Sequence, residues 1–295
     1  MDMKKVYEKK YMRCFLIVGI FLAAAAAVCI YVVNRNRYDF DKSFFQIIDQ
    51  YDTRSYTAEE LREIYARDHF LEDLVNFNEE LNRQQEGFQF VEIDIQPIEL
   101  IGHWDKPASL VNGYGHKDLR NQKVQYEGKE IEITPVDCFQ VGKQSQFSLF
   151  GKEIFQEDAF VQQGDVVLLM LGSGFQGYYK TGDTIRFIYL NKTWTGKVAG
   201  FLENETKIAM DDFFVYELDH AMVMPFFSRL DINTETETDT DAGAYFDRDF
   251  QIDYFFRKNA GYLKMQNKEA YKEGRRLIEK LAEKYRLDYT LLRGY

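Results

Sequence analysis

The chain has 295 residues, 48 acidic against 37 basic side chains and a formal net charge of −11. With 45% hydrophobic and 16% aromatic residues, it is not a disordered chain, a collagen-like repeat or a polytopic membrane bundle. The negative charge also argues against nucleic acid as a partner, because phosphates attract a basic face. Three cysteines are too few for a dense disulfide framework.

The charge is divided unevenly along the chain. Residues 1–33 carry a net charge of +3, so the remaining residues carry −14, and the two sum to the total of −11. Residues 14–33 form an uncharged run of twenty residues, CFLIVGIFLAAAAAVCIYVV. At ~1.5 Å of helical rise per residue, this run is ~30 Å long, which matches the hydrocarbon core of a bilayer. The run is apolar on all sides, so it predicts a transmembrane helix embedded in lipid rather than an amphipathic surface helix.

Two cleaved alternatives remain open for this run. A secretory signal peptide has an apolar region of about 7–15 residues, which is shorter than the run here. A lipoprotein signal would place its lipidated residue at Cys29, but the bulky Val28 precedes it and apolar residues follow. Under the uncleaved reading, the basic segment 1–13 is cytoplasmic by the positive-inside rule, and residues 34–295 are extracytoplasmic. The predicted location is therefore the cell membrane, with a single pass.

Beyond the anchor, the pattern predicts an α+β ectodomain in three parts. Residues 34–119 form the first part of an αβ subdomain, and residues 226–295 form its second part, which includes an acidic loop at 231–241. Residues 120–225 form a β-rich subdomain inserted between them.

In the first part, a helix is predicted over 57–86. Thr57 and Glu60 form a capping box at its start, and Gly87 suits its end. The segment FQFVEIDI at 88–95 predicts a strand. Its alternation slips between Phe90 and Val91, which indicates either a bulge or burial on both faces.

The remaining elements follow in chain order. The middle part predicts a hairpin over 124–133 around Glu127–Lys129, a buried strand over 165–171, and a second hairpin over 184–202 around Asn191–Lys192. The last part predicts a strand over 250–256, a helix over 269–285 and a closing strand over 289–292.

Two motifs resemble ligand sites, but their surroundings do not fit. Gly172–Gly177 reads GxGxxG, yet a dinucleotide site needs a helix directly after the glycines, and Tyr178–Asp183 leads into another strand. A tight connection between strands is therefore predicted. Residues 231–241 alternate acidic side chains as a calcium loop does, but Thr236 stands where an EF-hand needs glycine. A solvated loop is predicted, and whether it binds a cation stays open.

The side chains that usually carry chemistry show no productive spacing. The four histidines, His69, His103, His116 and His220, form no zinc-binding pattern, and Cys138 is the single cysteine of the exported part. The nucleophile motifs GxSxG and SxxK are absent. The sequence therefore predicts no catalytic residue, no cofactor-binding residue and no metal ligand, and a protein that is not an enzyme.

Five segments carry a resemblance to a known family. They are FSLFGKEIF at 147–155, DVVLLMLG at 165–172, YKTGDTI at 179–185, WTGKVAGFL at 194–202 and DHAMVMP at 219–225. Together they resemble the extracytoplasmic domain, or periplasmic core domain, of bacterial MacB/FtsX-type ABC transporter permeases. These residues would determine the fold, through turns such as Gly182–Asp183 and core positions such as Val198, rather than catalyse a reaction.

The resemblance implies both a layout and a function. It implies a discontinuous αβ subdomain, called porter in the family, interrupted by a β-rich one. It further implies contact with membrane lipid through residues 14–33, a cytosolic ABC ATPase as partner, transport or signalling outside the membrane, and a homodimer as one possible assembly.

The chain departs from the family in one respect. After Val33 it has no second apolar run long enough to span a bilayer, whereas the family has further membrane helices after the ectodomain. The chain is then either a fragment of a permease or a single-pass relative. The alternative function is a single-pass extracellular binding or sensing module without an ATPase.

Overall fold

The computed structural model describes residues 44–49, 57–83, 88–102, 122–161, 165–209, 215–228, 230, 247–265 and 268–292. The chain divides into two compact units, Met1–Asp41 and Lys42–Tyr295. The predicted segment 1–13, the predicted transmembrane helix 14–33 and the acidic loop 231–241 lie outside the described residues. Within the described ranges, no helix has the length and apolar character needed to cross a bilayer.

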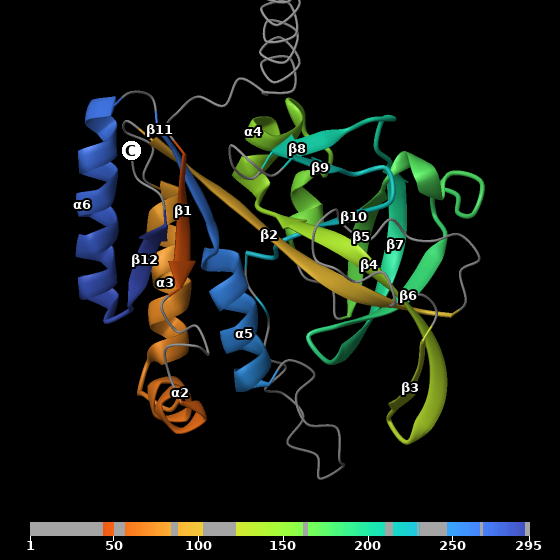
Figure 1. The fold of residues 1–295 in the computed structure, drawn as a ribbon, viewed down its shortest axis with the longest axis horizontal. Coiled ribbons are helices and arrows are strands. Elements are labelled where there is room, and N and C mark those ends of the chain that lie inside the picture. Colours follow the sequence, from red (N-terminus) through yellow and green to blue (C-terminus); the bar gives the residue numbers. More distant parts are fainter. Residues whose placement is uncertain are drawn as a thin grey trace, which may run out of the picture. The chain divides into compact units, whose positions relative to one another are not determined.

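The two ends of the second unit build one antiparallel layer (Figure 1). Its strands are ordered β12 (Tyr289–Leu292), β1 (Phe44–Asp49), β11 (Gly261–Met265) and β2 (Phe88–Ile101), and each is antiparallel to its neighbour. The strands of the first β-α-β unit alternate with those of the last one. This interleaved order is that of a split β-α-β arrangement, as in ferredoxin-like folds.

Helices accompany this layer and pack on one another. They are α2 (Ala58–Tyr65), α3 (Phe70–Arg83), α5 (Arg248–Asn259) and α6 (Lys268–Tyr285), and α3 contacts both α5 and α6. The ring of Phe77 on α3 stacks on Tyr289 with 4.3 Å between centroids. The Tyr285 hydroxyl on α6 donates a hydrogen bond of 2.7 Å to Glu80. The first and last parts of the chain therefore share one core.

The middle of the chain forms a six-stranded barrel. Its strands are β2, β6 (Thr184–Tyr189), β7 (Lys192–Phe201), β5 (Val166–Leu171), β10 (Met222–Pro225) and β4 (Lys129–Val141). The ring closes because β4 pairs back with β2. The pairs β5–β7 and β4–β10 are parallel, and the others are antiparallel. The long strand β2 belongs to both the layer and the barrel.

Shorter elements decorate the barrel. β3 (Gln122–Tyr126) forms a hairpin with β4, while β8 (Lys207–Ala209) and β9 (Val215–Glu217) form a separate ribbon. The turns between strands carry η1 (Lys143–Ser145), α4 (Gln146–Phe150), η2 (Glu157–Phe160) and η3 (Ser173–Phe175).

The predicted helix over 57–86 begins as expected but is interrupted. The capping box is present, because the Thr57 side chain accepts from the Glu60 amide and Glu60 accepts from the Thr57 amide. The chain then breaks into α2 and α3, since His69 adopts φ 65°. The left-handed conformation cannot continue a helix. The break lets the ring of Tyr65 stack on Phe70, 5.7 Å away.

The predicted strand over 88–95 is confirmed and continues to Ile101 as β2. Phe90 and Val91 are both buried, in two separate hydrophobic clusters, so burial on both faces explains the slip in alternation. Both predicted hairpins are confirmed. The second turns at Leu190–Asn191, one residue earlier than predicted, with φ of 49° and 59°.

The predicted strand over 250–256 is wrong, because this segment belongs to helix α5. The Asp247 side chain caps the helix by accepting from the Phe250 amide at 2.9 Å. Phe250, Ile252, Tyr254 and Phe255 are all buried, so apolar residues surround the helix instead of marking one face. A short apolar run of this kind does not distinguish a helix from a strand. The helix over 269–285 and the strand over 289–292 are confirmed as α6 and β12.

The Gly-rich segment is a connection between strands, as predicted. It carries η3 and leads into β6 without an intervening α-helix. Gly172 is required because a Cβ there would lie 1.9 Å from the Leu218 carbonyl oxygen. Its amide donates to the Ala221 carbonyl at 2.9 Å, which holds the two backbones in close approach.

Candidate functional site

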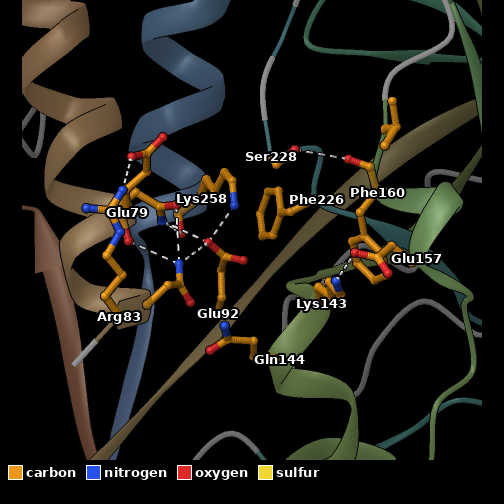
Figure 2. A pocket seen from close by; sticks show the side chains of 13 residues that line it. Glu79, Arg83, Glu92, Lys143, Gln144, Glu157, Phe160, Phe226, Ser228 and Lys258 are labelled. Carbon is orange, nitrogen blue, oxygen red and sulfur yellow. Dashed lines mark hydrogen bonds and ion pairs between the residues drawn. The ribbon is translucent and has the colours of Figure 1, made fainter. Parts of the chain in front are cut away.

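A cavity of about 620 Å³ opens where the antiparallel layer meets the barrel (Figure 2). Its size falls within the range of small-molecule sites, about 300–1,000 Å³. Helices α3 and α5 form one wall, η1 and η2 form the opposite wall, and β2 and the segment after β10 form the floor. The lining residues are Asn78, Glu79, Asn82, Arg83, Glu92, Lys143, Gln144, Glu157, Phe160, Val161, Phe226, Ser228 and Lys258.

A buried ion pair lies at the floor of this cavity. Lys258 Nζ donates to Glu92 Oε1 at 2.6 Å, and the two side chains are only 5% and 4% exposed. Asn78 and Asn82 donate to the same carboxylate oxygen at 2.8 and 3.2 Å. Burying these charges is costly unless they pair with each other and form further hydrogen bonds. The three donors to Oε1 meet that requirement.

Glu92 is held by the turn that follows β4. Its amide donates to Ser145 Oγ at 2.7 Å, and its carbonyl accepts from the Gly142 amide at 2.9 Å. A Cβ at position 142 would lie 2.0 Å from Glu92 Oε2, so only glycine leaves room for this carboxylate. The barrel thus positions a side chain that β2 brings from the layer.

Helix α5 positions the lysine. The Lys258 ammonium lies 5.7 Å from the centroid of the Phe226 ring, a cation–π arrangement. One turn earlier, the Tyr254 hydroxyl accepts from the Phe227 amide at 2.6 Å. Burial raises the pKa of the Tyr254 hydroxyl. These two contacts hold helix α5 against the segment after β10 at the edge of the cavity.

The rim of the cavity carries two exposed ion pairs. Arg83 contacts Glu79 at 2.8 Å on α3, and Lys143 contacts Glu157 at 2.5 Å across the opposite wall. The Lys143 hydrogen bond lowers the pKa of the Glu157 carboxyl. Exposed pairs of this kind contribute little stability. Among the described residues that line the cavity, three are cations and three are anions, so the charges of these residues balance.

A second set of polar side chains lies at the junction of α5 with the barrel. Arg257 Nη1 and Asp94 Oδ2 are 3.6 Å apart, too far for a good hydrogen bond. Among the described residues, Asp94 Oδ2, Gln140 Oε1, Tyr189 OH and Arg257 Nε are buried without hydrogen-bond partners. Burial raises the pKa of Asp94 despite the nearby Arg257 charge. Burial also raises the pKa of Tyr189, and the Asp94 charge adds to it.

The residues weighed from the sequence do not assemble into a site. His69 is exposed in the α2–α3 turn and contacts Glu72 at 2.7 Å. Cys138 is fully buried in the barrel, and burial raises the pKa of its thiol. His103 and His116 lie outside the described residues. In the described part of the chain, no three His, Cys, Asp or Glu side chains cluster as metal ligands.

Sequence reasoning missed Glu92 and Lys258. The available signal was weak: Glu92 is the one charged residue among FQFVEI at 88–93, and Lys258 follows the aromatic run at 254–256. Charged residues inside apolar segments indicate buried, paired groups. The sequence did not show that they pair with each other, because 166 positions separate them.

No protein-family model, curated protein or solved structure matches the chain. The resemblance to permease ectodomains therefore depends on the sequence motifs alone.

Proposed function

We propose that the chain is the membrane-anchored, non-catalytic extracytoplasmic domain of a MacB/FtsX-type ABC permease. It would couple a cytosolic ATPase to export or signalling outside the membrane. The uncharged run at 14–33, its basic flank and the five permease-like segments support this proposal.

One geometric observation carries the proposal. Gln46 near the start of β1 pairs with Leu292 at the end of β12, and Asp49 pairs with Tyr289. Because the two strands are antiparallel neighbours, the start of β1 and the end of β12 lie side by side at one end of the layer (Figure 1). A domain inserted between two membrane segments needs its two ends at the same pole. A shift of either segment would act directly on these paired strands.

The layer is also linked mechanically to the barrel. β2 runs through both without interruption. The Glu92–Lys258 pair joins α5 to this strand, and Ser145 joins the strand to the barrel turn. Motion at the paired ends of the layer would therefore reach the barrel through covalent chain and buried polar contacts. A continuous path of this kind is what a force-transmitting ectodomain requires.

A binding or sensing module is the second candidate, and the cavity of about 620 Å³ favours it. A single-pass module of this kind would work without an ATPase. The two candidates differ in their response to nucleotide on the cytosolic side.

The discriminating experiment uses the full chain in its native membranes, prepared as sealed right-side-out vesicles loaded with ATP or a non-hydrolysable analogue. The permease proposal predicts that an ATP-hydrolysing subunit co-purifies with the chain after cross-linking. It also predicts that the external protease digestion pattern of the barrel differs between the two nucleotides. If no such subunit is found and the digestion pattern is the same with both nucleotides, the permease proposal is contradicted and the binding module is favoured.

A further inference from the structure

We propose that the cavity binds a zwitterionic α-amino acid with a large apolar side chain. In this arrangement, the ligand ammonium donates to Glu92 Oε2, and the ligand carboxylate accepts from Lys258 Nζ. The inference does not depend on the proposed function, because it concerns the purified chain without any partner.

Glu92 has hydrogen-bonding capacity that the described residues do not use. Its Oε1 already accepts from Asn78, Asn82 and Lys258. No hydrogen bond joins its Oε2 to another described residue, and in Figure 2 no dashed line reaches this second carboxylate oxygen of Glu92. Glu92 lines the cavity and its side chain is only 4% exposed. A buried carboxylate with an oxygen free to accept favours a charged N–H donor from a ligand.

Lys258 has the complementary capacity to donate further hydrogen bonds. An ammonium group has three N–H donors. In the described part of the chain, one of them is used by Glu92, and the Phe226 ring covers another side of the group. Donors therefore remain for an anionic oxygen in the cavity. The free acceptor and the free donors lie next to each other, because the pair is joined at 2.6 Å.

The charges around the cavity are balanced. The described residues that line it include three cations and three anions, so a ligand with a single charge would bring a charge without a counter-charge to the buried pair. A zwitterion brings both charges. In an α-amino acid the ammonium and the carboxylate are separated by one carbon atom, which suits two protein charges in direct contact.

An apolar wall lies beside the ion pair. Phe160, Val161 and Phe226 lie on the barrel side of the ion pair, and Val161 is 58% exposed. A large apolar side chain of the ligand would cover this surface and remove it from water. The volume of about 620 Å³ leaves room for leucine or phenylalanine.

The test measures binding to the full chain in detergent by isothermal titration calorimetry. The probes are L-phenylalanine, L-leucine, N-acetyl-phenylalanine, phenylalanine amide and the dipeptide Phe-Phe. We expect the two free amino acids to bind. Each capped form should bind at least about tenfold more weakly, because it lacks one charge. The dipeptide, whose charges are farther apart, should also bind more weakly.

Two variants locate the site. Glu92→Gln keeps the size of the side chain but removes the charge, so phenylalanine affinity should fall at least about tenfold. The matched control is Glu203→Gln, in an exposed ion pair with Lys152 remote from the cavity lining, and it should leave the affinity unchanged. If Glu92→Gln does not fold, the comparison of free and capped ligands on the wild-type chain still tests the proposal. Absence of binding by both amino acids, or equal binding of free and capped forms, would overturn the proposal.

Discussion

Replacing Lys258 by methionine tests how much the buried ion pair between α5 and β2 stabilises the junction of the layer with the barrel. Methionine keeps the length of the aliphatic chain against Phe226 but removes the ammonium. Glu92, which is 4% exposed, then keeps its negative charge with only the Asn78 and Asn82 amides as side-chain donors. Breaking a buried pair by removing one partner costs about 3–5 kcal/mol. For a domain of this size, that corresponds to a fall in Tm on the order of 10 °C.

The double variant Lys258→Met with Glu92→Gln separates the effect of charge from the effect of packing. It removes both charges while keeping an oxygen that can accept from the two asparagines. We expect it to be more stable than Lys258→Met by about 2 kcal/mol or more, because no uncompensated charge remains.

Urea unfolding of the full chain, followed by tryptophan fluorescence, provides the measurement. Trp194 is 2% exposed and its ring lies 6.0 Å from Phe250 on α5, so it reports on the same junction. If Lys258→Met costs less than about 1 kcal/mol, or if the double variant is no more stable than the single one, the ion pair does not stabilise this junction.

Three further predictions concern stability. Gly172→Val should lower the free energy of unfolding by about 3 kcal/mol, since its Cβ would fall 1.9 Å from the Leu218 carbonyl oxygen. Thermal melts should show the same loss with and without NAD or ATP. A nucleotide-induced rise in Tm of the wild type that the variant loses would contradict the interpretation of this segment as a connection between strands. The raised native pKa of Asp94 means that its contribution to stability falls as pH rises from its ordinary pKa through the native one. Asp94→Asn should therefore gain stability relative to wild type as the pH of urea titrations rises above the ordinary pKa of an aspartate, and a difference that does not vary with pH would contradict the burial of that charge beside Arg257. Thr57→Ala removes the helix cap and should cost about 1 kcal/mol; an unchanged urea midpoint would show that the cap has no effect on stability.

Local signals predicted much of the fold. The capping box at Thr57, the turn at Glu127–Gly128 and the one-sided pattern of residues 269–285 each depend on neighbours in the sequence. The error at 250–256 has a physical cause: α5 is packed between the layer and the barrel, so its apolar residues follow no single face.

The candidate site could not be predicted in the same way. Glu92 and Lys258 meet only because β2 and α5, from opposite ends of the chain, are brought together by the interleaved layer. The position of the Glu92 carboxylate also depends on Gly142, because a side chain at position 142 would occupy the same space. No local pattern marks a glycine as the neighbour of a glutamate fifty positions away.

Protease accessibility of the full chain decides whether the domain is extracytoplasmic and anchored in the membrane. Intact cells or protoplasts that express the chain with an N-terminal tag are treated with an external protease, and the tag and the domain are followed by immunoblot. We expect residues 34–295 to be digested and a membrane-bound fragment that carries the tag to be protected. Protection of the whole domain in intact cells, or release of a soluble mature species lacking residues 1–28, would contradict a membrane-anchored extracytoplasmic domain.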